Sequence, residues 1–213
     1  MNDTKPFAIT LDVGGSLLNK TGSWRTERPV YLDRLPPCND MCPAGENIQE
    51  WLYHAENGEY KKAWLEIMKN NPFPAVMGRV CYHSCEDACN RVHLDDPVGI
   101  NSVERFLGDQ ALINQWKVEP GKSSGKKIMI VGAGMAGLAC AYHLRLFGHD
   151  VTIFESSSKS GGMVRYGIPK YRMPNEKLNA EIHRIQDMGV TIELNTKIDD
   201  VIATKEKYGF DAV

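Results

Sequence analysis

Apolar residues in the first half of the chain recur at the spacing of amphipathic helices. Two runs follow the i, i+3, i+4, i+7 rule, first Ile48, Trp51, Leu52 and Ala55, and then, beyond the stop at Asn57-Gly58, Tyr60, Ala63, Trp64 and Ile67. A third helix is predicted from about Ser102 to Trp116, with Val103, Phe106, Leu107 and Ala111 on one face. These three stripes predict a small helical core.

The second half of the chain alternates short apolar runs with helical patterns. Three runs read as strands, "KKIMIV" at 126–131, "HDVTIFE" at 149–155 and "GVTIEL" at 189–194. Helices are expected between them, one ending near Phe147 and one from about Lys177 to Met188. Strands that alternate with helices are typical of an α/β domain with a parallel sheet.

Composition divides the chain into four parts. Residues 1–37 are an extended lead-in whose glycines and prolines interrupt any long period, and residues 38–117 form the helical domain. Residues 118–126 are polar and rich in Gly, Ser and Lys, as in a linker. Residues 127–213 begin the α/β domain, and no internal repeat is present.

Charge and hydropathy exclude several classes of partner. The 213 residues carry a formal net charge of -2, so neither nucleic acid nor an acidic membrane is expected as the main partner. The first ten residues lack the basic and apolar regions of a signal peptide, so we expect a cytoplasmic protein. The most apolar stretch, "IMIVGAGMAGLACAYHL", carries three regularly spaced glycines that have a better explanation than a membrane span.

Five of the six cysteines lie between residues 38 and 89, which favours metal ligation in a reducing compartment. An iron–sulfur cluster is expected first, and zinc, a disulfide or unliganded thiols are the alternatives. Cys81, Cys85 and Cys89 follow one another at intervals of four residues. An unbroken helix would separate Cys81 from Cys89 by about 12 Å, too far for one tetrahedral metal. Either the segment bends, or two cysteines serve one centre and the third faces elsewhere.

A glycine-rich turn joins the first two predicted strands. Gly132 would allow the tight turn, Gly134 the close approach of a pyrophosphate, and Gly137 the packing of helix against strand. Glu155 ends the second strand, where it is placed to accept the ribose hydroxyls. FAD and NAD share this fingerprint, and glycines that serve packing alone are the alternative. The following Gly161-Gly162 pair favours FAD, unless it is simply a turn.

Four motifs in order resemble one family, the small-subunit type of NADPH-dependent glutamate synthase, which also forms the N-terminal part of dihydropyrimidine dehydrogenase. The motifs are "CNDMCPAGENIQEWL", "GRVCYHSCEDACNR", "VGINSVERF" and "GGMVRYGIPKYRMP". The lead-in "TLDVGGSLLNKTGSWRTERPVY" resembles the branch that delivers electrons to dissimilatory sulfite reductase in sulfur-metabolising bacteria.

The resemblance implies an α-helical iron–sulfur domain followed by an α/β Rossmann-like FAD-binding domain. Electrons would pass between NAD(P)H, FAD and a 4Fe-4S cluster, to or from a partner redox enzyme. Sulfite reductase is the expected partner, the large subunit of glutamate synthase is the alternative, and a homodimer is compatible with the family. The nicotinamide domain and the rest of the FAD domain would lie beyond residue 213, so the chain is expected to be a fragment.

The resemblance also assigns the flavin site. The residues expected at the cofactor are Gly132, Ala133, Gly134, Ala136, Gly137, Glu155, Gly162 and Arg172. Arg172 would pair with the pyrophosphate or polarise the flavin, and its alternative is a surface arginine beside Lys170. No catalytic acid, base or nucleophile is assigned. Cys140, within the helix after the glycine turn, is expected to be a core thiol.

The resemblance divides the other cysteines between two centres. Cys42, Cys81 and Cys85 would hold one 4Fe-4S cluster, with Glu104 as an unusual fourth ligand. The alternative for Glu104 is a capping box with Asn101 at the start of the third helix. Cys38 and Cys89 would hold a second cluster, which stays open because "RPVYLDRLPPC" lacks the family's two further cysteines. A docking module with structural zinc and no turnover is the hypothesis from another class.

Overall fold

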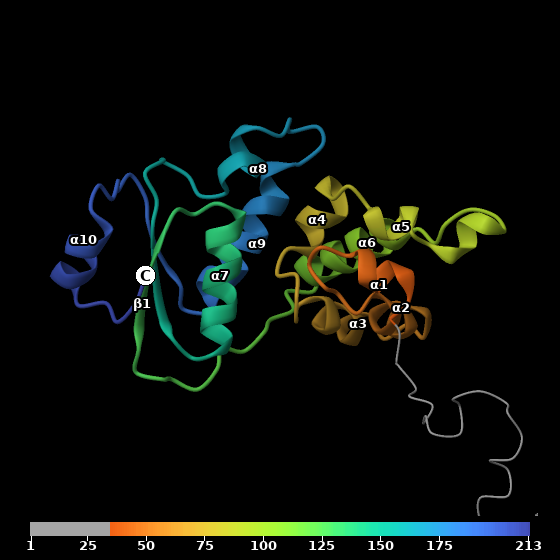
Figure 1. Cartoon of the computed structure of the whole chain (residues 1–213), viewed down its shortest axis with the longest axis horizontal. Helices are drawn as coiled ribbons and strands as arrows, with labels where there is room; N and C mark the ends of the chain where they lie inside the picture. Colours follow the sequence, from red (N-terminus) through yellow and green to blue (C-terminus); the bar gives the residue numbers. More distant parts are fainter. Residues whose placement is uncertain (1–34) are drawn as a thin grey trace, which may run out of the picture. The chain divides into compact units, whose positions relative to one another are not determined.

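A computed structural model describes residues 35–213 (Figure 1). Its elements are α1 (Pro37–Met41), α2 (Ile48–Glu56), α3 (Tyr60–Ile67), α4 (Pro74–Val80), α5 (Ser84–Asp87), the 3-10 helix η3 (Asn90–His93), α6 (Ile100–Ile113), β1 (Lys127–Val131), α7 (Met135–Leu146), β2 (Asp150–Phe154), α8 (Gly162–Tyr166), α9 (Asn175–Asp187), β3 (Thr191–Glu193) and α10 (Val201–Tyr208). The lead-in predicted for residues 1–37, including its sulfite reductase-like motif, falls almost wholly outside the described residues.

The helices α1 to α6 form the first part of the described chain, and the predicted periodicities account for three of them. Side chains from α2, α3 and α6 make a small core of Ile48, Trp51, Ala63, Ile67, Ile100 and Leu107. The third helix, predicted from Ser102 to Trp116, begins earlier, at Ile100, and ends at Ile113. Phe106 was expected on its buried face but is 42% exposed, because its ring packs edge-on against Tyr60 outside this core.

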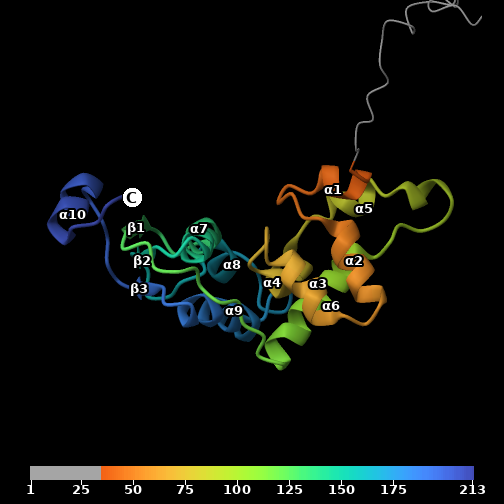
Figure 2. The same ribbon diagram turned by 90° about the horizontal axis from the view of Figure 1, so that it is seen from below.

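The three strands form a parallel sheet in the order β1-β2-β3, as the alternation of strands and helices predicted. Helices α7 and α9 lie on one face and α10 on the other, as Figures 1 and 2 show. The third strand is shorter than "GVTIEL", since only residues Thr191–Glu193 pair with β2. Ala212 forms a parallel bridge to Ile128 on the other side of β1.

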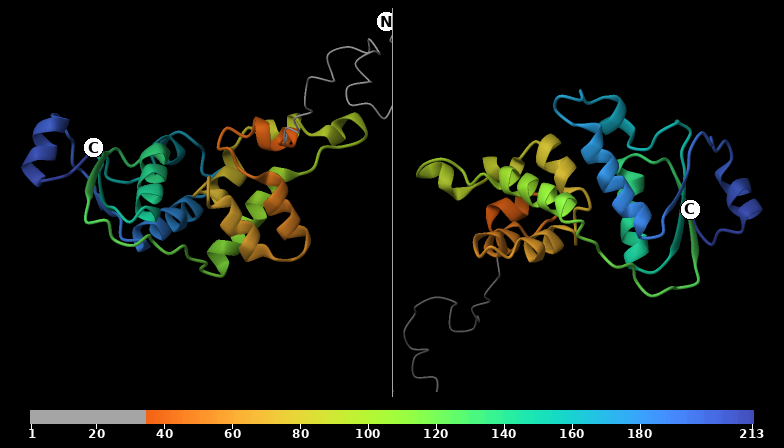
Figure 3. Two further views of the ribbon diagram at one scale, coloured as in Figure 1. Left: turned by 60° about the horizontal axis from the view of Figure 1, so that its bottom comes forward. Right: turned by 180° about the vertical axis from the view of Figure 1, so that it is seen from behind.

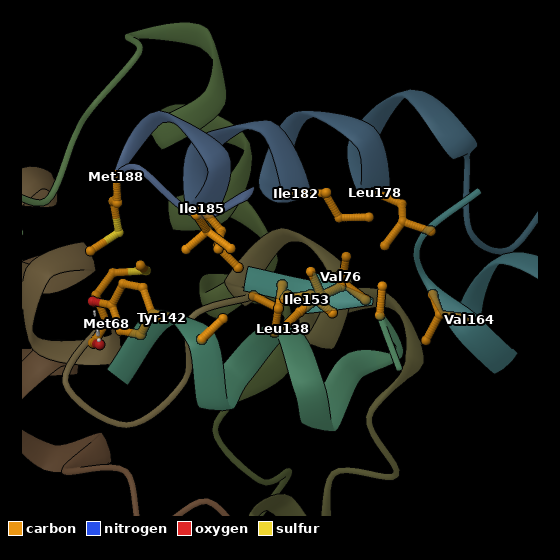
Figure 4. Packing of buried hydrophobic residues seen from close by; sticks show 14 of the residues in the cluster. Met68, Val76, Leu138, Tyr142, Ile153, Val164, Leu178, Ile182, Ile185 and Met188 are labelled. Carbon is orange, nitrogen blue, oxygen red and sulfur yellow. Dashed lines mark hydrogen bonds between the residues drawn. The ribbon is translucent and has the colours of Figure 1, made fainter. Parts of the chain in front are cut away.

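A second, larger core joins the helical part to the α/β part. Met68 and Val76 of the helical part pack with Leu138, Ile153 and Ile185 of the α/β part (Figure 4). Helices α4 and α6 lie against α9, which Figure 3 shows from two further directions. The predicted linker at 118–126 therefore connects two parts whose apolar side chains pack in one core. The domain boundary at this linker stays a prediction.

Polar side chains of the α/β part reinforce this junction. The fully buried carboxylate of Glu181 in α9 accepts hydrogen bonds from the backbone N–H groups of Ala75 (3.0 Å) and Val76 (3.1 Å), in the first turn of α4. Arg184 donates to the carbonyl of Pro72 at 2.7 Å. The hydroxyl of Tyr142 donates to the carbonyl of Met68 at 2.9 Å (Figure 4). The segment from Met68 to Val76 is thus fixed by α7 and α9.

Across residues 35–213, none of the helices combines the length and the apolar character needed to cross a bilayer. The apolar stretch that includes Gly132, Gly134 and Gly137 is instead divided between β1, a turn and α7.

Candidate cofactor sites

The cysteine segment bends instead of forming one long helix. Cys81 follows the end of α4 in an extended conformation, and His83 takes the left-handed region with φ of 61°. A new helix, α5, then carries Cys85 and ends at Asp87, so that Cys89 precedes the 3-10 helix η3. The bend follows from the left-handed residue, because that conformation cannot continue a right-handed helix.

Three of the cysteines and Glu104 line one cavity of about 270 Å³. Cys42 comes from the end of α1, Cys81 and Cys85 from either side of the bend, and Glu104 from α6. The hydroxyl of Ser84 donates to the carbonyl of Met41 at 3.0 Å and so ties α5 to α1. The structure thus brings together the four side chains that the resemblance assigns to one cluster, and their ligation of iron stays a prediction.

Burial disfavours the thiolate form of two of the cysteines in this cavity. Burial, reinforced by the neighbouring charges of Cys81, Glu86 and Cys42, raises the pKa of Cys85 to about 12. Burial also raises the pKa of Cys42, against hydrogen bonds from backbone N–H groups that favour its thiolate. Iron binds the thiolate, so a positively charged group in the cavity would reverse this preference.

Two buried carboxylates lie at the wall of the same cavity. Glu104 is 6% exposed and Glu46 is 7% exposed, and both line the cavity. The side-chain amide of Asn71 donates to Glu46 at 2.9 Å and to Glu104 at 2.8 Å, while the Trp51 indole donates to Glu46 at 3.2 Å. Burial raises the pKa of Glu46 and raises that of Glu104 well above its ordinary value, with the charge of Glu46 adding to the effect on Glu104.

The capping-box alternative for Glu104 is wrong. Helix α6 starts two residues before Ser102, with Gly99 at its N-cap and no side-chain cap. The Asn101 N–H donates to the carboxylate of Glu86 at 2.8 Å, and the Asn101 side chain donates to the carbonyl of Met77. Glu104 therefore does not take part in a helix cap, and its carboxylate accepts a hydrogen bond from Asn71 instead.

The remaining cysteines lie outside the lining of this cavity. Burial raises the pKa of Cys38, and the charge of Cys89 adds to the increase. A second cluster at Cys38 and Cys89 stays a prediction. Cys140, which was expected in the core, is exposed, because it lies on the outer face of α7.

The donor set fits a 4Fe-4S cluster, because three thiols and one carboxylate supply the four ligands that such a cluster needs. A zinc ion would need its sulfur ligands about 2.3 Å from a common centre. Within residues 35–213 no three His, Cys, Asp or Glu side chains stand close enough together for a single ion. The zinc alternative therefore requires these side chains to move closer together.

The glycine turn between β1 and α7 has the geometry that its sequence predicted. Gly132 has a φ of 100°, which residues with a side chain rarely adopt. A Cβ atom on Gly137 would lie 2.0 Å from the carbonyl oxygen of Gly132, so only glycine lets α7 pack this closely. A Cβ on Gly134 would meet no atom within 4 Å, so the space beside it is open.

The second glycine pair docks on the first turn. The N–H of Gly161 donates to the carbonyl of Ala133 at 2.7 Å, and a Cβ on Gly162 would lie 2.9 Å from the Gly134 Cα. Ala133 is buried beneath the turn, whereas Ala136 is exposed on the first turn of α7. The two loops therefore border one surface at the start of α7, where backbone N–H groups and the helix dipole suit a pyrophosphate.

Glu155 follows β2, as predicted, and its carboxylate braces the turn. It accepts hydrogen bonds from the N–H groups of Ala133 and Ser157, each at 2.7 Å. Burial favours the neutral acid, but these bonds outweigh it and lower the pKa of Glu155. The Ser156 hydroxyl also donates to this carboxylate, at 3.3 Å. A carboxylate has about four acceptor sites, so capacity for about one ribose hydroxyl remains.

Arg172 lies on the loop before α9 and is exposed. Its Nε donates to the carbonyl of Arg79, two residues before Cys81, at 3.4 Å. The expected role of Arg172, to pair with the pyrophosphate or to polarise the flavin, stays a prediction. No local pattern singles out Glu46 or Asn71; the nearest signal is that Glu46 lies inside the cysteine motif "CNDMCPAGENIQEWL".

Two family models match the chain. Residues 27–116 match the domain described as dihydropyrimidine dehydrogenase domain II, 4Fe-4S cluster. Residues 130–191 match the NAD(P)-binding Rossmann-like domain.

Three curated proteins show the extent of the similarity. The chain is 40% identical over 189 residues to the beta subunit of an NADPH-Fe(3+) oxidoreductase from Geobacter sulfurreducens (86% of this chain, 28% of that protein). It is 35% identical over 201 residues to the beta subunit of an NADP(+)-dependent formate dehydrogenase from Moorella thermoacetica (83% and 28%). It is 38% identical over 175 residues to the small chain of NADPH glutamate synthase from Bacillus subtilis (81% and 36%). The chain thus spans roughly a third or less of these relatives.

Proposed function

We infer that this chain is an electron-transfer subunit of an oxidoreductase. It joins a 4Fe-4S domain of the dihydropyrimidine dehydrogenase domain II type to an NAD(P)-binding Rossmann-like domain. In this proposal electrons pass between NAD(P)H, FAD and a 4Fe-4S cluster, and then to or from a partner redox enzyme. The relatives are iron–sulfur NAD(P)H oxidoreductase subunits by name, which supports this class of function and the family predicted from the motifs.

One observation carries the proposal: the helix that follows the glycine turn also lines the cysteine cavity. Met135, the first residue of α7, and Ala139, one turn later, line the cavity together with Cys42, Cys81 and Cys85. Gly134, directly before Met135, is the N-cap of α7 and has open space beside it. The two proposed cofactor sites therefore adjoin the same helix.

The chain's own residues would act by holding and orienting the two cofactors. Cys42, Cys81 and Cys85 supply thiolates, and Glu104 supplies an oxygen. The backbone N–H groups after Gly132 would bind the pyrophosphate, and Glu155 would orient the ribose. A flavin supplies the exchange between two-electron hydride chemistry and single electrons.

FAD is proposed for the glycine turn because of the second loop. Gly161 and Gly162 dock on Ala133 and Gly134, at the position where the family's flavoproteins place a Gly-Gly pair. Sulfite reductase is the proposed partner and the glutamate synthase large subunit is the second candidate. A pull-down with the tagged full-length protein would separate them, because each predicts a different co-purifying enzyme.

Anaerobic purification followed by analysis of iron, sulfide, zinc and flavin tests the proposal. We expect about four irons and four sulfides per chain, FAD, and an EPR signal after reduction. Stoichiometric zinc with neither iron nor flavin would overturn the proposal and favour a docking module that holds structural zinc. Iron with bound NAD(P) in place of flavin would overturn the FAD assignment alone.

A further inference from the structure

We propose that Asn71 is a positioning residue that holds the carboxylate of Glu104 toward the cysteine cavity. The inference rests on the proposed function, in which that cavity holds a cluster. Asn71 lies in the loop between α3 and α4, is 5% exposed, and lines the cavity with Glu104 and Glu46. It belongs to none of the residue types that ligate iron in the predicted site, so its contribution would come through Glu104.

The hydrogen bonds of Asn71 fix the orientation of its amide. The Nδ2 group donates to Glu46 Oε1 at 2.9 Å and to Glu104 Oε1 at 2.8 Å, which uses both of its N–H bonds. The Oδ1 atom accepts from the Phe73 N–H at 3.0 Å. A reversed amide would place its oxygen against two carboxylates, so only the observed orientation satisfies all three contacts.

Asn71 leaves one oxygen of Glu104 available for a metal. Among the described residues, Asn71 is the one group that donates a hydrogen bond to Glu104, and it binds Oε1. The other oxygen, Oε2, accepts no hydrogen bond from residues 35–213. Glu104 lines the cavity with Cys42, Cys81 and Cys85, so Oε2 is the oxygen that this proposal assigns to the cluster.

Asn71 also moderates the repulsion between the two carboxylates. The Nδ2 group of Asn71 lies between the two acids, 2.9 Å from Glu46 Oε1 and 2.8 Å from Glu104 Oε1. A neutral donor placed between the two acids lets both side chains face the same cavity. Groups that orient a metal ligand in this way typically change metal affinity or activity 10- to 100-fold when they are removed.

The backbone around Asn71 is held from the α/β part. The carbonyls of Met68 and Pro72 accept hydrogen bonds from Tyr142 and Arg184, and Glu181 accepts from the Ala75 N–H. These contacts flank Asn71 on both sides in the sequence. A substitution at Asn71 should therefore alter the side-chain contacts with Glu46 and Glu104 more than the path of the loop.

The test compares Asn71→Asp with Asn57→Asp in the anaerobically purified protein with its cluster. Both variants add one negative charge, but Asn57 is exposed at the end of α2 and lies outside the lining of the cavity. Asn71→Asp replaces two N–H donors by an acceptor. We expect it to change the EPR spectrum and the midpoint potential of the cluster, as Glu104→Gln does, whereas Asn57→Asp leaves both unchanged. In a Glu104→Gln background, Asn71→Asp should add little, because the two substitutions disrupt one interaction.

The outcomes separate this inference from the function on which it rests. Wild-type protein without a cluster signal would overturn the proposed function. A wild-type signal that Asn71→Asp leaves unchanged at full iron content would overturn the role of Asn71 alone. If Asn71→Asp does not fold, Asn71→Leu, which removes the donors without adding charge, is measured against the same criteria. If neither Asn71→Asp nor Asn71→Leu folds, Asn71 has a purely structural role and the inference is overturned.

Discussion

The glycine turn and the cysteine cavity are built in different ways, although α7 begins at the turn and also lines the cavity. The turn site is formed mainly by two backbone segments, the turn that starts at Gly132 and the loop at Gly161-Gly162. Glycine conformations and backbone N–H groups define the surface proposed to bind the cofactor. The cavity is assembled from side chains on α2, α4, α5, α6 and α7 and on the segments that follow α1 and flank α4. A backbone site can be read from a short motif, whereas a side-chain site depends on how distant segments pack.

The two sites also differ in their electrostatics. At the turn, N–H donors lower the pKa of Glu155 despite its burial, so the charged form is already stabilised. In the cavity, burial raises the pKa values of Cys42, Cys85 and Glu104. The turn thus stabilises its own carboxylate, whereas burial in the cavity favours the neutral forms of Cys42, Cys85 and Glu104. A ligand that binds only the folded state stabilises it, so cluster binding should stabilise the helical part.

Removal of Cys81 should have the largest effect. We expect Cys81→Ser to lose the iron signal, because the substitution deletes one of three thiols in the cavity. Cys38→Ser is the matched control. Cys38 lies outside the lining of the cysteine cavity, so this variant should leave the iron signal largely intact. Iron analysis and EPR measure the outcome. Iron loss in Cys38→Ser with iron retained in Cys81→Ser would mean that the cysteines are divided differently.

Much of the fold could be predicted from the sequence, because its signals are local. Helices α2 and α3 follow from apolar spacing, and β1, α7 and β2 follow from the strand, glycine turn and helix pattern. Helices α1, α4, α5, α8 and α10 were not predicted, since they are short or weakly periodic. The bend at His83 was one of two alternatives, because nothing in "CYHSC" requires a left-handed residue.

The missing parts of the site depend on contacts between distant residues. Asn71 meets Glu46 and Glu104 across 25 and 33 positions, and Glu181 meets Ala75 across 106 positions. A single Asn or Glu carries no sign of such a partner in its local pattern. The resemblance therefore predicted the three cysteines and Glu104, but neither the carboxylate of Glu46 nor the amide of Asn71.

Loss of Glu181 tests whether the two sites share one rigid support. Glu181→Ala would leave Arg184 and the first N–H groups of α4 without their buried carboxylate, and breaking a buried ion pair typically costs about 3–5 kcal/mol. Glu176→Ala, on the exposed side of the same helix, is the control. Chemical denaturation measures the difference in unfolding free energy. A similar small loss in both variants would mean that the junction is held by apolar packing alone.

Within the turn, Gly137 and Gly134 should respond differently to the same added methyl group. Gly137→Ala places a Cβ 2.0 Å from the Gly132 carbonyl oxygen, and overpacking of this kind typically costs about 1–3 kcal/mol of stability. Gly134→Ala meets no protein atom within 4 Å, so it should leave the melting temperature almost unchanged. If a pyrophosphate occupies that space, Gly134→Ala should nevertheless weaken dinucleotide binding in titrations. Equal losses of stability would contradict this division of roles.

The smallest effect is expected at Glu155 and depends on pH. Because its pKa is lowered in the folded state, Glu155 contributes stability above its unfolded pKa, about 4.3, and loses it as the pH falls through the folded value. Glu155→Gln keeps one carbonyl acceptor but loses the charge, so it should cost about 1 kcal/mol at pH 7 and progressively less in acid. Denaturation of wild type and variant between pH 7 and pH 3 measures this convergence. Parallel curves of unfolding free energy against pH would show that the carboxylate charge does not brace the turn. Convergence of the curves, together with weaker dinucleotide binding by the variant at pH 7, would support both predicted roles of Glu155, in bracing the turn and in binding the ribose.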